Sequence, residues 1–362
     1  MRLNPPLRRG QLGLTLVELM ISVVIGLVAL AALLVVYLGS RAAYVSSDSL
    51  ARVQESGRFA VEFIAQEARM SGFMGCRSRN LSDADQSLIN ITNPPVAFSG
   101  SRDAIRGFDG SNAASISLWT NLTPIARVGA SDVITIRRAT GQMVGIAANS
   151  DPVARTVTIR HNALGIGNGD LVVLGNCERA MLFYVTNSPA TTGVGTFPTV
   201  LEFNASGGGP SGTLGNDTSI PLPAFEVTSR AEVMRVVETS YFIGVNSAGR
   251  PALFRASGGA VEELVDNVED MDVLYGVAGP DGDGVIEAYR RADQIPAADW
   301  ARVVSARISL LVAAPTDNVA TGEQTYVFRE TTGDGVADQQ TAPDRRLRHV
   351  FTATISLRNR VL

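Results

Sequence analysis

The 362-residue sequence has no lysine and only two each of cysteine, histidine and tryptophan. His161 and His349 are far apart, without the neighbouring acids or nucleophile that a general base or a catalytic triad needs. The cysteines form no CxxC pair and no cluster with histidine, which argues against zinc binding and thiol redox chemistry. We therefore expect no enzymatic activity.

The charge balance is slightly acidic, with 35 acidic residues against 31 basic ones and a formal net charge of −4. No basic patch stands out along the chain, and this argues against nucleic acid as a partner. A hydrophobic fraction of 45% and this length predict a folded body with a substantial core, in one large or two ordinary domains.

One long hydrophobic run, residues 19–40, contains neither charge nor proline. About 20 helical residues span about 30 Å, the thickness of a bilayer core, and we expect a transmembrane helix over about 17–38. Arginines precede the run, so the N-terminus should be cytoplasmic and the body periplasmic. The alternative is a secretory signal cleaved after Ala43. The length of the run and the acid Glu18 near its start count against that alternative.

Gly13 followed by Leu14-Thr15-Leu16-Val17-Glu18 resembles the prepilin signature of type IV pilins and type II secretion pseudopilins. The resemblance implies that a prepilin peptidase removes residues 1–13 by cutting after Gly13, and that Leu14 is then N-methylated. It also implies that the helix stays in the inner membrane until the subunit enters a filament. Leu14 departs from the family, which most often has phenylalanine there.

Glu18 would be the fifth residue of the mature chain, since 18 − 13 = 5. In the family this acid pairs with the N-terminal amine of a neighbouring subunit, so the resemblance gives Thr15 and Glu18 a role in filament assembly. The physical argument agrees, because a buried amine and carboxylate each cost much alone and little as a pair.

Helical periodicity continues over residues 41–71, now with one apolar face. We expect one helix from about Thr15 to Ser71, ended by Gly72 and Gly75, within a helical segment 14–72. The alternative is two helices broken near Gly39-Ser40. Arg58 and Glu62 have the spacing of a helical ion pair. The apolar face consists of Leu50, Val53, Gly57, Ala60, Val61, Ile64 and Ala68.

Beyond the helix, residues 73–362 alternate with the period of β-strands, and we predict a large antiparallel β-rich head, a pilin-like α+β fold. Two subdomains meeting near 230–250 are plausible at this length. The segment 204–218 is glycine-rich, which predicts a mobile loop. Residues 261–268 fit either a short helix or a strand. Predicted strands are 115–119, 133–136, 156–159, 171–174, 181–185, 200–203, 232–245, 251–255, 271–277, 303–313 and 349–358, with a helical turn at 296–300.

Two further sites can be read from the head. Cys76 and Cys177 would form a disulfide if the head lies outside the cytoplasm, and the alternative is two buried thiols. Asp281, Asp283 and Glu287 have acid spacing that suits calcium, but Asp-Gly pairs are also common turn residues, and we expect an ordinary turn.

A narrower resemblance links the head to PilW-type minor pilins. It rests on residues 72–76, 268–277, 299–311 and 348–360. It implies a minor pilin that primes and caps a type IV pilus, in twitching motility and adhesion. Its partners would be other minor and major pilins, the inner-membrane assembly platform and a tip adhesin. The alternatives are a tip pseudopilin of a type II secretion system and a signal-anchored periplasmic enzyme or receptor.

Overall fold

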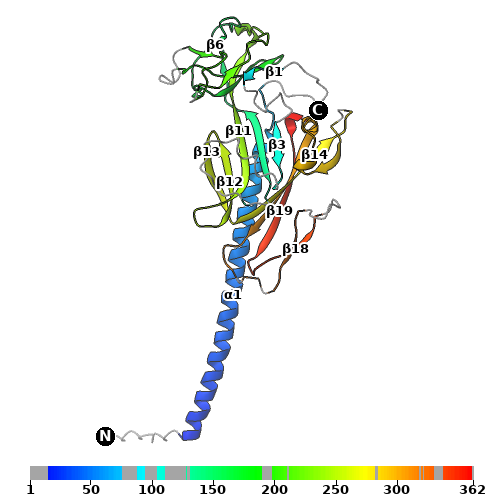
Figure 1. Ribbon diagram of the computed structural model, residues 1–362. Coiled ribbons are helices and arrows are strands. Elements are labelled where there is room, and N and C mark those ends of the chain that lie inside the picture. Colours follow the sequence, from blue (N-terminus) through cyan, green and yellow to red (C-terminus); the bar gives the residue numbers. More distant parts are fainter. Residues whose placement is uncertain are drawn as a thin grey trace, which may run out of the picture.

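The protein combines one long helix with a β-rich head at one end of it, as the computed structural model shows (Figure 1). The predicted α+β class is confirmed. The structure describes residues 15–75, 88–93, 104–110, 128, 131–189, 198–209, 212–281, 284–317, 319–320, 322–329 and 337–360.

Helix α1 runs without a break from Leu16 to Arg69, and its 54 residues extend over about 80 Å at 1.5 Å per residue. The chain contains no proline between these ends, and Gly39-Ser40 lies within the helix, so the two-helix alternative is wrong. Gly72 follows the helix with a φ of 74°, a conformation that glycine adopts without steric cost and that turns the chain away from the helix axis.

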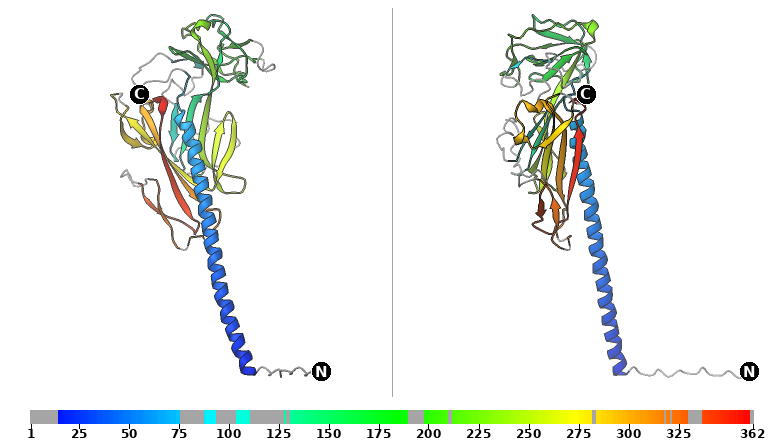
Figure 2. Two further views of the ribbon diagram at one scale, coloured as in Figure 1. Left: turned by 180° about the vertical axis from the view of Figure 1, so that it is seen from behind. Right: turned by 90° about the vertical axis from the view of Figure 1, so that its right-hand side faces the viewer.

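A four-stranded antiparallel sheet packs against the second half of α1 (Figure 2). Its order is β15-β14-β16-β19, and β16 and β19 lie against the helix. The bounds are Val268–Ala278 for β14, Ile286–Arg290 for β15, Val303–Ala313 for β16 and Arg348–Ser356 for β19. Residues 303–313 thus form a strand with the predicted bounds.

A second sheet is built around the 14-residue strand β11, Glu232–Val245. Its first residues pair with β5 and β7, and its later residues pair with β4 on one side and β12 on the other. Residues 261–268, for which a helix or a strand was predicted, are mostly strand. The neighbours are β3 (Ile105–Phe108), β4 (Val133–Ala139), β5 (Val144–Gly145), β7 (Leu171–Gly175), β12 (Pro251–Ser257) and β13 (Ala260–Asp266).

The end of the head farthest from the N-terminus holds β8 (Ala180–Tyr184) beside β7, and β1 (Leu88–Asn90) beside β8 (Figure 1). β1 runs parallel to β8, which departs from the predicted antiparallel order. The remaining strands form small pairs: β6 (Thr156–Ile159) with β9 (Thr199–Glu202), β2 (Thr92–Asn93) with β10 (Gly215–Asn216), and β17 (Thr325–Val327) with β18 (Gln339–Thr341).

The glycine-rich segment 204–218 is more ordered than predicted in its described part. Asn216 is buried, and its amide donates to the carbonyls of Tyr184 at 2.9 Å and Asn204 at 3.1 Å. Its own carbonyl accepts the N–H of Tyr184 at 2.9 Å. One asparagine side chain therefore ties the segment to β8, and composition alone could not show this.

The described residues form four buried apolar clusters, and the two largest are the main cores of the head. The larger lies between α1 and the two sheets and includes Trp300, Tyr241 and Tyr275, while the other fills the far end around Phe183 and Phe203. Strand β11 contributes to both, with Tyr241 in the first and Val233 in the second. Short 3-10 turns lie between strands at Val227–Ser229 (η3), Ala292–Gln294 (η4) and Asp299–Arg302 (η5), and a further one, Arg358–Arg360 (η6), follows β19.

Candidate assembly surface

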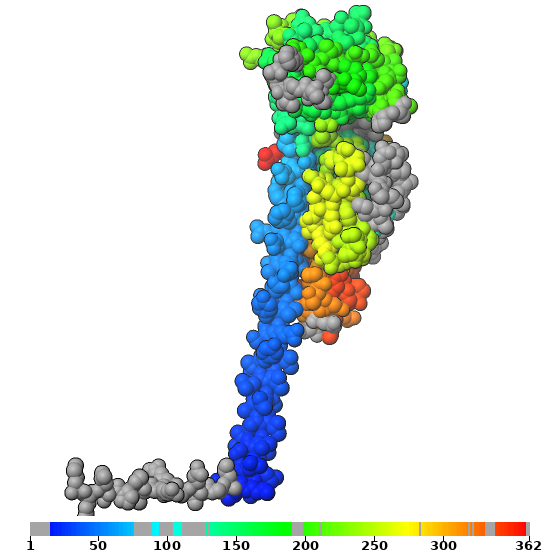
Figure 3. Space-filling view, turned by 90° about the vertical axis from the view of Figure 1, so that its left-hand side faces the viewer, coloured from blue at the N-terminus to red at the C-terminus, as the bar shows by residue number. Residues whose placement is uncertain are grey.

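The first half of α1 projects beyond the head as a free rod (Figure 3). Every residue from Leu16 to Tyr44 is exposed, and Leu, Ile, Val and Ala dominate up to Leu38. By length and composition this is a helix that could cross a membrane. An apolar surface of this extent on all sides of a helix needs lipid or other helices around it.

The free rod begins with a capping box formed by Thr15 and Glu18. Oε2 of Glu18 accepts the backbone N–H and the hydroxyl of Thr15, each at 3.0 Å, and the Thr15 hydroxyl oxygen accepts the N–H of Glu18 at 3.3 Å. The T-x-x-E spacing is the signature of this motif and is visible in the sequence, although the capping box was not among the predicted features.

The capping box leaves part of the Glu18 carboxylate available. Its hydrogen bonds to described residues all use Oε2, and Oε1 has no such partner in the part of the chain that the structure describes. A carboxylate has about four acceptor positions, so a cation could still bind here. Gly13 and Leu14, the predicted cleavage and methylation residues, lie outside the described residues.

The second half of α1 buries one face against the head. The face consists of small and branched residues: Ser49, Val53, Gly57, Ala60, Ile64, Ala65 and Ala68. Of the predicted apolar face, Leu50 is exposed and Val61 half-buried. Gly57 permits the closest approach, because a Cβ there would stand 2.1 Å from the ring of Phe351 on β19.

A half-buried ion pair fixes the end of the helix to β4. Nε and Nη2 of Arg138 donate to the two carboxylate oxygens of Glu67 at 2.7 and 2.8 Å, the two-pronged geometry that suits guanidinium and carboxylate. The predicted pair of Arg58 and Glu62 is wrong, since Glu62 instead accepts from Arg69 at 3.1 Å.

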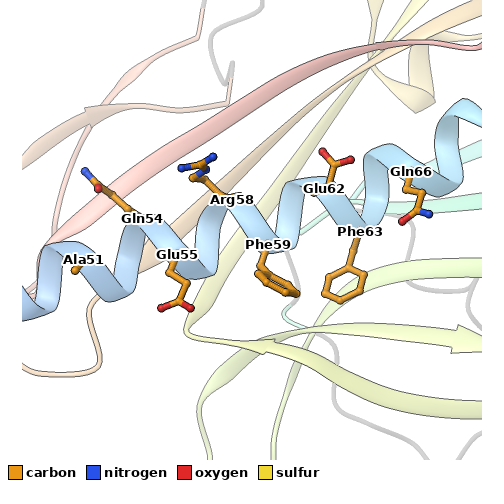
Figure 4. Close-up of a pocket in the computed structure, with 8 residues that line it drawn as sticks. All are labelled: Ala51, Gln54, Glu55, Arg58, Phe59, Glu62, Phe63 and Gln66. Carbon is orange, nitrogen blue, oxygen red and sulfur yellow. The ribbon is translucent and has the colours of Figure 1, made fainter.

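The opposite side of this half carries a groove beside two aromatic rings (Figure 4). Phe59 and Phe63 project from the same side of α1, with ring centroids 5.3 Å apart, while Arg58 and Glu62 point away from them. Phe59 is 58% exposed. We call the lining residues the Phe59 groove: Ala51, Gln54, Glu55, Arg58, Phe59, Glu62, Phe63 and Gln66.

The other predicted sites lie in the head. Cys177 is not a free thiol, but Cys76 lies outside the described residues, so their pairing stays a prediction. Asp283 also lies outside, and no metal-binding group of three or more ligands occurs within the described part of the chain. Glu287 follows the first residue of β15 and its carboxylate lies over Gly279, so calcium binding at Asp281, Asp283 and Glu287 remains untested.

The two histidines occupy separate elements. His161 lies in the turn after β6 and its Nδ1 is buried without a hydrogen-bond partner among the described residues. His349 is an exposed residue of β19. Its ring centroid lies 4.7 Å from that of Phe351, and the two rings are arranged edge to face.

Two family models match the chain. Residues 240–359 match the type IV pilus-assembly protein W, and residues 8–34 match the prokaryotic N-terminal methylation motif. The chain is therefore similar to PilW-type prepilins. This confirms the resemblance predicted from the sequence, and it supports a pilus-related role for a pilin-like protein. The PilW match covers the last six residues of β11 and every strand from β12 to β19, and these strands include the sheet that packs against α1.

Comparison with other proteins adds little. No curated protein matches the chain. Among solved structures, a type IV-like pilin from Thermus thermophilus matches with 19% identity over 34% of this chain and 67% of that chain. Its TM-score is 0.22, and a similarity this low has no bearing on the fold.

Proposed function

We propose that this PilW-type protein is a minor pilin that primes the assembly of a type IV pilus and stands at or near its tip. It acts through helix–helix and head–head contacts. The observation that carries the proposal is the division of α1 into an apolar free rod and a half that is built into the head core.

In this account the prepilin peptidase cuts after Gly13 while the rod lies in the inner membrane and the head in the periplasm. The new amine of Leu14 is methylated. Glu18 then binds the N-terminal amine of a neighbouring subunit through the carboxylate oxygen that the capping box leaves free. The capping box itself reduces the cost of holding this carboxylate in the membrane before assembly, because two donors already satisfy Oε2.

The Phe59 groove supplies a second contact surface in the same proposal. It lies on the helix face turned away from the buried stripe, and it is bordered by charges of both signs, Glu55, Arg58 and Glu62. An exposed ring, here Phe59 beside the half-buried Phe63, with a polar rim is a common composition of a protein–protein contact. Neighbouring pilin subunits are the partners we assign to it, together with the assembly platform and a tip adhesin for the protein as a whole.

A tip pseudopilin of a type II secretion system would share the rod and the N-terminal motif. The PilW match over residues 240–359 favours the pilus. A signal-anchored periplasmic enzyme or receptor would keep the rod as its anchor and would need a catalytic cluster or a ligand pocket in the head. A secretory signal would be cut after Ala43, but residues 40–43 lie in the middle of the continuous helix α1. Cleavage at that point would require the helix to unwind.

Deletion of the coding sequence tests the proposal. We expect loss of surface pili and of twitching, both restored by the full-length chain, with normal levels of secreted enzymes. Loss of secreted enzymes with intact pili would instead establish the secretion pseudopilin and overturn the pilus assignment.

A further inference from the structure

A group of four aspartates lies where the two sheets of the head meet. Asp109 follows β3, Asp132 precedes β4, and Asp270 and Asp272 belong to β14. Asp109, Asp132 and Asp272 are buried, with 5%, 5% and 7% of their surface exposed. A backbone hydrogen bond also joins the two elements here, because the N–H of Asp132 donates to the carbonyl of Met271 in β14 at 2.9 Å. The aspartates therefore belong to the joint between β4 and β14.

Two arginines face these four carboxyls. Arg291 pairs with Asp109. Arg329, two residues after the end of β17, is shared between three carboxyls. Its Nη2 lies 3.0 Å from Oδ1 of Asp270 and 3.8 Å from Oδ1 of Asp132, and its Nε lies 3.5 Å from Oδ1 of Asp272. Fully ionised, the six groups would carry 2 − 4 = −2 charges. Uncompensated charge at buried positions is costly, and taking up a proton relieves that cost.

Asp132 is the carboxyl with the weakest pairing to Arg329. Its Oδ1 accepts the N–H of Gly110 at 3.2 Å and its Oδ2 accepts the N–H of Val273 at 2.9 Å. Burial outweighs these bonds and the charge of Arg329, and it raises the pKa of Asp132 to about 7, with Asp272 and Asp109 acting in the same direction. Burial also raises the pKa values of Asp270 and Asp272.

A fully buried hydroxyl also belongs to β14, the strand that carries Asp270 and Asp272. Oη of Tyr275 has no hydrogen-bond partner among the described residues. Burial raises the pKa of Tyr275, and the negative charges of Asp132 and Asp272 raise it further.

We propose that Asp132 binds a proton in the folded head and makes the joint between β4, β14 and the β17–β18 hairpin sensitive to pH. When Asp132 is neutral, Arg329 pairs with Asp270 and Asp272 and so holds the β17–β18 hairpin to β14. Ionised Asp132 adds a third anion beside the same guanidinium and changes the summed charge of these six groups from −1 to −2. The joint is therefore tightest below neutral pH and loosens as the pH rises.

The direction of the stability change follows from the pKa of Asp132 in the unfolded chain and in the folded head. The unfolded chain releases this proton near the ordinary aspartate value of 3.8, whereas the folded head releases it near 7. Between these values folding takes up a proton, so the free energy of unfolding falls as the pH rises. The stabilisation that this proton gives the folded head is complete below pH 3.8 and is lost as the pH rises through about 7.

Urea unfolding of the full-length chain in detergent, followed by tryptophan fluorescence between pH 5 and 8, tests this proposal (a range of about one to two units on either side of the transition). We expect the midpoint of the wild type to fall with rising pH and Asp132→Asn to remove most of that fall. Asp151→Asn is the matched control, because Asp151 also accepts two backbone N–H groups, from Val153 and Ala154 at 2.8 Å each, but is exposed. The urea midpoint of Asp151→Asn should fall with rising pH as that of the wild type does.

A wild type without pH dependence, or an Asp132→Asn variant that keeps the full fall, would overturn the proposal. Arg329→Gln tests it independently should Asp132→Asn fail to fold. Removal of the guanidinium raises the pKa of Asp132, so the fall in midpoint should move to higher pH. A fall at an unchanged pH in this variant would also contradict the proposal.

Discussion

The two halves of α1 differ in burial and in composition although they form one unbroken helix. From Leu16 to Leu38 every residue is exposed and almost all are apolar, whereas from Ser49 to Ala68 one stripe is buried and most of the other residues are polar or charged. The buried stripe is made largely of small residues, which allow the sheet to approach the helix axis. The comparison shows that one helix can carry two interfaces, one complete within the chain and one that needs partners from outside.

Replacing Glu18 by alanine should have the largest effect, and only on the first half. Without this carboxylate the amine of a neighbouring subunit is left unpaired, which costs about 3–5 kcal/mol in a buried pair. We expect cleavage to proceed and surface pili to be nearly absent, as counted by electron microscopy, with an unchanged urea midpoint for the head.

Thr15→Ala is the matched control for the role of the acid itself. It removes the hydroxyl from the capping box at a cost of about 1 kcal/mol but keeps the carboxylate. Pili should be reduced less than in Glu18→Ala. Normal filament numbers with Glu18→Ala would remove the pairing role from this account.

In the second half, Gly57→Ala should destabilise the head. The added methyl would overlap the ring of Phe351, and overpacking of this kind costs about 1–3 kcal/mol even though alanine favours helix. Urea unfolding should show the loss. The control is Gly39→Ala, because nothing lies within 4 Å of a Cβ at Gly39.

A double variant provides a second control for the contact between Gly57 and Phe351. Gly57→Ala combined with Phe351→Leu shortens the opposing side chain and should recover part of the lost stability. Equal stabilities of Gly57→Ala and the wild type would show that the helix does not dock against β19 as described.

Glu67→Gln should have an intermediate effect. It leaves Arg138 half-buried without its carboxylate, at a cost of about 1–3 kcal/mol in the free energy of unfolding. The exposed pair of Asp48 and Arg52 on the same helix provides the contrast, and Asp48→Asn should change stability by less than about 0.5 kcal/mol. Similar losses in both variants would contradict the distinction between the docked face and the solvent face.

Phe59→Ser should have the smallest effect on the isolated chain. The ring is 58% exposed, so the free energy of unfolding should change by less than about 1 kcal/mol. If neighbouring subunits use the Phe59 groove, pili should still become fewer. The matched change on an exposed position outside the groove, Val153→Ser, should leave their number unchanged.

Much of this architecture could be predicted because each element repeats a simple period. The apolar run and the stripe of the second half predicted α1 to within two residues at each end. Alternation at 303–313 and 232–245 gave strands with the observed bounds. The predicted strand 115–119 lies outside the described residues.

The long-range features could not be derived in this way. The pairing of β11 with β5, β7 and β4, the parallel pairing of β1 with β8 and the convergence of Asp132 with Asp270 and Asp272 join segments more than 50 residues apart. Local periodicity carries no information on such pairings. The Thr15–Glu18 capping box is different, since its spacing was visible in the sequence.

The most direct test of the central claim is the mass of the N-terminal peptide of the protein purified from cells with and without the prepilin peptidase. Our account predicts a peptide that begins at Leu14 and carries a methyl group when the peptidase is present, and the uncut N-terminus when it is absent. A chain that begins at Tyr44, or one that stays uncut in both strains, would contradict the assignment of α1 as a prepilin helix.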